Sequence, residues 1–435
     1  MPFVQGTCPN CGGTLAVDNE KDAWVCPYCN TPFIVEKAVN NYNLTNNISA
    51  STVNIYGGSQ KDFEIVSGVL KKYNGEDTDV VIPDNVIEIG KHAFEKFQHL
   101  KSVRLSDSVE IIAEFAFSDC SSLVNVVFSK KTKIIDRFAF NGCKALNNIE
   151  LPDSLETISA CAFKDCSSIE KIIIPKKTTA LASEAFMGCS SLNEIKFSDE
   201  IKHIAESCFS GCCSLKEIVL PENVTHISNG AFENCSELKC INLPSKLKHI
   251  GSSAFKNCYN IQISNFPIEL ESIGSSAFES CKALKKLHIP NGVNRIGYRT
   301  FAYCQYVETI ILSDSVEIIE KEAFINNYYL KSISLPKHLK RISYGAFAQC
   351  ATLSSIDIPE SVEKIENWAF TYCTSLSNVN VKRELVNENN FSETPFYNEL
   401  ILNERRSKNV CLSCGGEFKG IIKKICTKCG KPKDY

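Results

Sequence analysis

The sequence predicts a solenoid of thirteen stacked 23-residue repeats with a small cysteine-bearing module at each end. Three observations lead to this prediction. A phenylalanine recurs at every twenty-third position, the apolar columns around it keep the same period, and a pair of CxxC motifs stands near each terminus. A fixed period of this kind is the signature of a repeat architecture.

The repeat has a strict register with no insertion or deletion. Isoleucine stands five residues before the phenylalanine in twelve repeats and Leu181 in the other; six residues after it, every repeat has Leu, Ile or Val. One turn therefore reads L-x-x-I-x-L-P-x-x-x-V-x-x-I-x-x-x-A-F-x-x-C. The thirteen motif phenylalanines are Phe94, Phe117, Phe140, Phe163, Phe186, Phe209, Phe232, Phe255, Phe278, Phe301, Phe324, Phe347 and Phe370.

Each part of the repeat predicts a local structure. The L-x-x-I-x-L part alternates like a short strand with one buried face, and the proline after it ends the strand. The V-x-x-I part predicts a second short extended segment. In the A-F-x-x-C part, Ala231, Phe232 and Cys235 stand at i, i+1 and i+4, which predicts one side of a helical turn. Stacked copies then bury their apolar columns against each other.

The cysteine three residues after the phenylalanine occurs in eleven of thirteen repeats and is replaced by Phe97 and Asn327 in the others. It lies beside the buried alanine and phenylalanine columns. We interpret it as a small apolar filler at a corner of the solenoid.

The segment LKEIVLPENVTHISNGAFENC (215–235) resembles the BspA-type leucine-rich repeat, and the resemblance covers about residues 62–380. It implies an α/β leucine-rich-repeat solenoid that is right-handed and carries a parallel sheet on one face. Many members of the family are exported surface proteins implicated in adhesion. We expect a zinc ribbon at 1–36, an Asn/Ser-rich linker at 37–60, an N-cap at 61–79, the repeats at 80–380, a C-terminal cap at 381–402 and a second zinc ribbon at 403–435.

The terminal CxxC pairs predict two structural zinc sites. Two such motifs supply four thiolates, which suits tetrahedral Zn²⁺ and leaves no coordination position open for catalysis. Redox or free cysteines are the alternative, but the thioredoxin-like context that a redox motif requires is absent. The ligands are Cys8, Cys11, Cys26 and Cys29 in the first site, and Cys411, Cys414, Cys426 and Cys429 in the second.

The two modules differ in charge. Residues 1–36 carry one lysine and four acidic residues, whereas residues 403–435 carry nine lysines or arginines and three acidic residues. The basic module suits a nucleic acid or an acidic protein, although a solvated lysine-rich surface is the simpler explanation and is favoured.

Two further columns are candidate binding surfaces. His203, His226 and His249 stand six residues before successive motif phenylalanines. They form either a metal or pH-sensing patch or a plain stack of surface histidines, and the lack of a carboxylate column favours the plain stack. A possible partner patch, for which half-buried packing is the alternative, consists of the late aromatics Tyr298, Tyr303, Tyr306, Tyr328, Tyr329, Tyr344, Trp368 and Tyr372.

The composition and the motifs of the chain limit the classes of function that we expect. The chain has 435 residues and a net charge of −3, and it shows neither a signal-peptide pattern nor a membrane-spanning run. We find no nucleotide-binding or catalytic motif, so we expect neither an enzyme nor a small-molecule substrate. The sequence thus predicts a cytoplasmic protein-binding scaffold. A nucleic-acid-associated protein and a surface adhesin exported by an unrecognised route are the alternatives.

Overall fold

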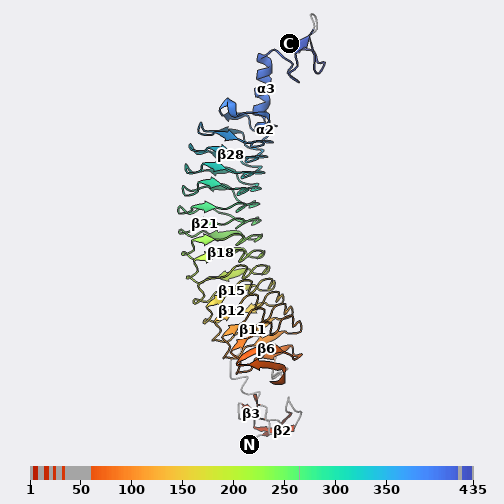
Figure 1. Ribbon diagram of the computed structural model, residues 1–435, viewed down its shortest axis with the longest axis vertical. Coiled ribbons are helices and arrows are strands. Elements are labelled where there is room, and N and C mark those ends of the chain that lie inside the picture. Colours follow the sequence, from red (N-terminus) through yellow and green to blue (C-terminus); the bar gives the residue numbers. More distant parts are fainter. Residues whose placement is uncertain are drawn as a thin grey trace.

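The computed structural model describes residues 60–263, 265–419 and 424–433, together with four short strands near the N-terminus. These strands pair in two antiparallel hairpins, β1 (Phe3–Thr7) with β2 (Thr14–Asp18) and β3 (Ala23–Val25) with β4 (Pro32–Ile34). Apart from Gln60, the predicted linker at 37–60 lies outside the described residues. Figure 1 shows the repeats stacked into one elongated rod.

Two columns of short parallel strands run along the rod. In each, partners lie one repeat apart, as with Val103 and Val126 in the first column and Ile112 and Ile135 in the second. This confirms the predicted parallel solenoid of about thirteen turns and its 23-residue register. The first column comprises β7 (Asp79–Val81), β9 (Ser102–Arg104), β11 (Asn125–Val127), β13 (Asn148–Ile149), β15 (Lys171–Ile173), β16 (Glu194–Lys196), β18 (Glu217–Val219), β20 (Cys240–Asn242), β23 (Lys286–His288), β25 (Thr309–Ile311), β27 (Ser332–Ser334), β29 (Ser355–Asp357) and β31 (Asn378–Asn380).

The second column holds the V-x-x-I segments, as strands of two residues. The isoleucine of each strand faces the core, and the residue before it is half-buried or exposed. This column comprises β8 (Glu88–Ile89), β10 (Ile111–Ile112), β12 (Ile134–Ile135), β14 (Thr157–Ile158), β17 (His203–Ile204), β19 (His226–Ile227), β21 (His249–Ile250), β22 (Ser272–Ile273), β24 (Arg295–Ile296), β26 (Ile318–Ile319), β28 (Arg341–Ile342) and β30 (Lys364–Ile365).

The predicted helical turn around A-F-x-x-C is wrong. None of the described residues from Phe63 to Lys382 is helical, so the repeats are β-solenoid turns and not α/β units. The N–H of Cys120 bonds to the carbonyl of Phe117 three residues back, while the N–H of Phe117 bonds to Ala139 in the next turn. Alternate amides thus bond along the stack, which prevents the i to i−4 pattern of an α-helix.

Left-handed residues produce this geometry. In every repeat the positions two before and two after the phenylalanine have positive φ, as at Phe115 (58°) and Asp119 (58°). A residue in this conformation interrupts a right-handed helix. Glycine, Asn or Asp, the residues that best tolerate it, stand at the second position in eight repeats, including Gly142 and Asn234. That enrichment is the sequence signal for turns instead of a helix.

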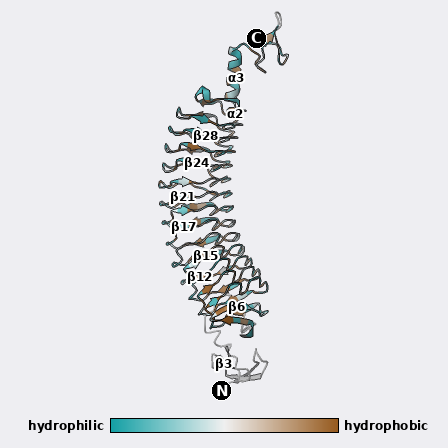
Figure 2. Cartoon of the chain, viewed as in Figure 1, coloured by the Kyte–Doolittle hydropathy of each residue, from teal (hydrophilic) through white to brown (hydrophobic). Residues whose placement is uncertain are grey.

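The motif phenylalanines form the centre of the core. Their rings stack face to face from Phe94 to Phe370, with centroids 4.9–5.8 Å apart and planes within 12° of parallel. All thirteen are buried. Figure 2 shows hydrophobic residues recurring on the strands of successive turns. The core is therefore one continuous column, and each turn depends on the turns on both sides of it.

Another aromatic ring covers each end of the phenylalanine stack. At the start, the hairpin of β5 (Phe63–Val66) and β6 (Val69–Tyr73) follows the short 3-10 turn η1 (Gln60–Asp62), and Tyr73 stacks on Phe94. At the other end, Phe391 stacks on Phe370. The elements there are η2 (Arg383–Leu385), α2 (Glu388–Phe391) and α3 (Pro395–Ser407). No helix in the described part of the chain is long and apolar enough to cross a membrane.

Candidate functional site

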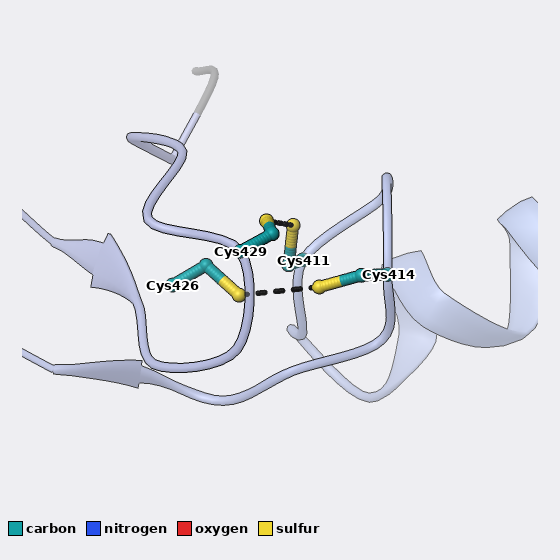
Figure 3. A group of neighbouring side chains, drawn as sticks. All are labelled: Cys411, Cys414, Cys426 and Cys429. Atoms are coloured by element: carbon teal, nitrogen blue, oxygen red, sulfur yellow. Dashed lines mark hydrogen bonds between the residues drawn. The ribbon is translucent and has the colours of Figure 1, made fainter.

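Four cysteines converge beyond the C-terminal end of α3. The sulfur atoms of Cys411 and Cys429 lie 3.6 Å apart, and those of Cys414 and Cys426 lie 3.3 Å apart. All four sulfurs lie within 4.8 Å of one another, and Figure 3 shows them pointing toward a common centre. The short antiparallel pair β32 (Phe418–Lys419) and β33 (Ile425–Cys426) joins the two CxxC motifs.

The two CxxC motifs have the same backbone geometry, offset by fifteen residues. The N–H of Gly415 bonds to Cys411 O at 2.7 Å, and the N–H of Gly430 bonds to Cys426 O at 2.9 Å. Both glycines have positive φ, 70° and 72°. Gly416 is required for a different reason, because a Cβ there would lie only 2.7 Å from Cys426 Sγ. The glycines thus allow each turn to aim its thiols inward.

The cluster has the chemistry of a tetrathiolate metal site. Metal–sulfur bonds of about 2.3 Å in a tetrahedron place sulfurs about 3.8 Å apart, close to the separations found here. Burial raises the pKa of the Cys426 thiol, but hydrogen bonds from the backbone N–H groups of Cys429 and Lys428 and from the neighbouring thiols lower that pKa to about 6. The same sharing of protons raises the pKa of Cys414 to about 12, so without a metal the cluster holds both a thiolate and a thiol. A thiolate is the form that binds metal. The four residues therefore fit a metal ion, which would be held by protein ligands alone.

The metal module is connected to the rod through α3. Arg405 in the last turn of that helix donates to the carbonyl oxygens of Leu412 (2.8 Å) and Ser413 (3.2 Å). These carbonyls belong to the first CxxC motif. Arg383, just before α2, pairs with Glu404 of α3. The C-terminal part of α3 is thus tied both to Arg383, which follows the last repeat, and to the cysteine cluster.

The predicted N-terminal site, formed by Cys8, Cys11, Cys26 and Cys29, lies outside the described residues.

The late aromatic residues form two groups. In the first, Tyr344 contacts Trp368 with ring centroids 5.2 Å apart, and Lys321 lies over the rings of both Tyr298 and Tyr344. In the second group, Tyr306 stacks on Tyr329 at 5.4 Å. No ring contact between described residues joins the two groups.

The second aromatic group is associated with lysines. Lys285 lies 5.0 Å above the Tyr306 ring, and Lys282 lies 4.8 Å above the Tyr259 ring, an exposed residue that the sequence analysis missed. Tyr328, beside Tyr329, bonds to Gln349. Tyr303 and Tyr372 occupy left-handed turn positions with φ of 59° and 60°.

The histidine column lies on the second strand column. His203, His226 and His249 are in register on β17, β19 and β21, with successive ring centroids 4.8 and 4.5 Å apart. They line the rod's surface and are half-buried or exposed.

The repeat cysteines have a role that sequence reasoning missed. In all eleven repeats that carry it, the thiol donates to the carbonyl of the motif phenylalanine of the preceding turn, as Cys235 does to Phe209 O at 3.2 Å. These thiols are all buried. Burial raises the pKa of the ten such thiols from Cys120 to Cys350, that of Cys120 to about 12, so these thiols stay protonated donors. Cysteine therefore fills the corner and also hydrogen-bonds along the stack.

Comparison with known proteins identifies the repeats. The family model for the BspA type leucine rich repeat region matches residues 72–193, 179–308 and 295–408. A search of the curated proteins found no match.

Solved structures show similar folds. A leucine-rich repeat protein from Bacteroides ovatus is 30% identical, with a TM-score of 0.67 over 76% of this chain and 88% of that one. A leucine rich cell surface protein from Faecalibacterium prausnitzii is 25% identical, with a TM-score of 0.49 over 79% of this chain and 99% of that one. The repeat register, the parallel strand columns, the family-model match and the 30% identity to the Bacteroides ovatus protein together place the chain in the BspA-type leucine-rich repeat family.

Proposed function

We propose that this protein is a non-enzymatic scaffold that binds another protein along its solenoid and carries a structural zinc ion at each end. The observation that supports it best is an uninterrupted stack whose surface residues vary from turn to turn while its buried core columns stay almost entirely apolar. Such a stack offers an extended face to a partner. The fold itself belongs to a class that typically mediates protein interactions.

Zinc is the metal that suits the C-terminal cluster best, because four cysteine thiolates favour Zn²⁺ over hard cations. The same spacing logic extends to Cys8, Cys11, Cys26 and Cys29. Metal analysis of the purified protein is expected to give two zinc ions per chain, and Cys414→Ser should reduce this to one. A wild-type value near zero would contradict the zinc assignment.

We assign the partner contact to the exposed tyrosines Tyr259, Tyr306, Tyr328 and Tyr329, called the tyrosine cluster below; lysines lie over the first two of these rings. Their side chains are 38–51% exposed although they are large and amphipathic. Tyrosine is enriched where protein interfaces concentrate their binding free energy. Their stacking and the two overlying lysines hold the rings in place, which lowers the entropy cost of binding.

An affinity pull-down from native cytosol tests this assignment. The double variant Tyr306→Ala/Tyr329→Ala should lose a partner that the wild type retains. Val219→Ser is the matched control, because Val219 is 74% exposed on the strand column and lies outside the cluster. If only the control variant loses the partner, the partner binds the strand face and not the tyrosine cluster.

Nucleic-acid binding through the C-terminal module is the second candidate. The exposed lysines Lys419, Lys424, Lys428 and Lys431 lie close in sequence to the cluster cysteines and favour this function. Binding to RNA or DNA that weakens steeply with salt and disappears in Lys424→Gln/Lys428→Gln would support this function.

We place the protein in the cytoplasm. None of the nineteen cysteines of the described residues forms a disulfide, a state that a reducing compartment maintains. Protease digestion of intact cells tests this location. Cleavage of the protein there would instead support the third function considered, that of a surface adhesin.

A further inference from the structure

We propose that the tyrosine cluster binds an acidic, extended segment of the partner protein, an inference that rests on the function proposed for this cluster. The four tyrosines stand four or five residues after motif phenylalanines, so they occupy the same corner of their turns. They therefore lie along one edge of the rod, where the neighbouring charges and the orientation of the rings decide which chemistry a ligand must have.

The edge that carries the tyrosine cluster is basic. In the five repeats from Phe255 to Phe347, the positions four, five, seven and eight residues after the phenylalanine contain four lysines and one glutamate, a net charge of +3. In the two repeats before them, the same positions contain two lysines and two glutamates. The excess of positive charge thus coincides with the tyrosines. The four lysines are Lys282, Lys285, Lys286 and Lys331.

Three of these lysines have no acidic partner. Among the described residues, Lys331 takes the one glutamate, Glu308, at 2.9 Å, and no ion pair involves the other three. The hydrogen bond and the charge of Lys331 lower the pKa of Glu308, and the charges of Lys285 and Lys286 lower it further. These ammonium groups are thus close enough to act on one carboxylate together, and they attract further carboxylates from a ligand.

The tyrosine rings present their edges to a ligand because their faces are covered. Lys282 lies 4.8 Å above the ring of Tyr259. Lys285 lies 5.0 Å above the ring of Tyr306, which also stacks on Tyr329 at 5.4 Å. Because Lys285 comes from the preceding turn and Tyr329 from the following one, both faces of Tyr306 are covered. The edge of an aromatic ring is electropositive, so the exposed ring edges also favour carboxylates.

The tyrosine hydroxyls add hydrogen-bond donors. The hydroxyl of Tyr328 donates to Gln349 Oε1 at 3.3 Å. Those of Tyr259, Tyr306 and Tyr329 have no hydrogen-bond partner among the described residues, and a phenolic O–H donates well to a carboxylate. Ring edges, hydroxyls and ammonium groups therefore all select the same kind of ligand.

The covered ring faces favour a peptide over a single-stranded nucleic acid, which stacks its bases on open aromatic faces. The length of the cluster favours an extended peptide. Tyr259 and Tyr329 stand three turns apart, which is about 14 Å at about 4.8 Å per turn. About five residues of extended chain span this distance.

The test is a fluorescence anisotropy titration of the full-length, zinc-loaded protein with a labelled peptide of alternating glutamate and serine, about ten residues long so that it spans the cluster. We expect the wild type to bind this peptide. Binding should be at least about tenfold weaker for the same peptide with glutamine in place of glutamate, for Lys282→Gln/Lys285→Gln and at high salt. Lys216→Gln/Lys239→Gln is the matched control and should bind as the wild type does, because these exposed lysines belong to the two turns whose charges balance.

The inference is overturned if the glutamate peptide does not bind, if Lys282→Gln/Lys285→Gln binds it as tightly as the wild type does, or if oligouridine of equal length binds these lysines more tightly. The pull-down with Tyr306→Ala/Tyr329→Ala separates this outcome from the proposed function. If that variant loses the partner but the wild type does not bind the peptide, the tyrosine cluster stays the interface and only the acidic partner is wrong. If that variant keeps the partner, the proposed function of the cluster fails.

Discussion

Asn327 occupies a cysteine position in the repeat, and its replacement by cysteine should stabilise the protein. The side chain is fully buried, and neither its amide nitrogen nor its amide oxygen reaches a hydrogen-bond partner among the described residues. The adjacent turns carry Cys304 and Cys350, whose thiols donate to Phe278 O (3.1 Å) and Phe324 O (3.4 Å). Asn327 is therefore the one break in the thiol ladder between them.

The expected gain follows from removing unsatisfied polar groups. A buried polar group without a partner costs about 1–3 kcal/mol. In Asn327→Cys the new thiol can donate to the carbonyl of Phe301, as its neighbours do one turn away. Cysteine is slightly smaller than asparagine, and the packing contacts that are lost cost about 0.8 kcal/mol for each methylene-sized group. We therefore expect a net stabilisation of about 1–2 kcal/mol.

Hydrogen exchange of the amides between residues 301 and 350 is the most direct assay, because repeat arrays open locally and need not unfold in one step. Urea denaturation measures the change in the free energy of global unfolding. Cys304→Asn is the mirror control and should destabilise by a similar amount. The reasoning is refuted if Asn327→Cys leaves exchange unchanged or accelerates it, since the amide would then already be satisfied.

Further predictions concern the core, the metal module and the surface charges. Cys235→Ala should keep the fold and the partner in the pull-down while costing about 1 kcal/mol in urea denaturation, through one weak hydrogen bond and a small cavity. Phe232→Ala, which removes a buried ring stacked on both sides, should cost about 3–5 kcal/mol and accelerate exchange in the adjacent turns. Chelation of the metal should expose amides at 411–433 to exchange and leave the repeats protected, because the core ends at Phe391 and its contacts. The hydrogen bond from Lys133 lowers the pKa of Glu110 in the folded protein. The pair therefore stabilises the fold at pH values above the pKa that Glu110 has in the unfolded chain, and this stabilisation is lost as the pH falls through the lower pKa of the folded protein. Between pH 6 and pH 3, the thermal midpoint should therefore decrease less for Lys133→Gln than for the wild type.

Much of the fold could be predicted because the same pattern of apolar residues recurs in all thirteen repeats. Phe232 and Ile227 recur at fixed spacing, and only stacking in register buries such columns completely. The helical turn was mispredicted because Ala231, Phe232 and Cys235 share the spacing of a helix face. Spacing alone does not show that alternate amides bond to the next turn.

The candidate sites were predictable to different degrees. The C-terminal cysteines are close in sequence, so the two CxxC motifs alone indicated a metal cluster. The approach of Lys282 and Lys285 to the tyrosine rings depends on the side-chain geometry of neighbouring turns, and no pattern within one column contains it. The same holds for Arg405, whose contacts with the CxxC carbonyls arise from the path of α3.

The sequence by itself determined the period, the number of turns, the buried columns and the chemistry of the cysteine cluster, because these depend on which residues recur and how far apart. The tertiary structure alone decided where backbone and side-chain hydrogen bonds go. It made the corners left-handed turns, turned the repeat cysteines into donors along the stack, left Asn327 without a partner among the described residues and brought lysines over the tyrosine rings. Hydrogen bonds need atoms within about 3 Å and in the right direction, and a linear pattern does not specify such distances between turns.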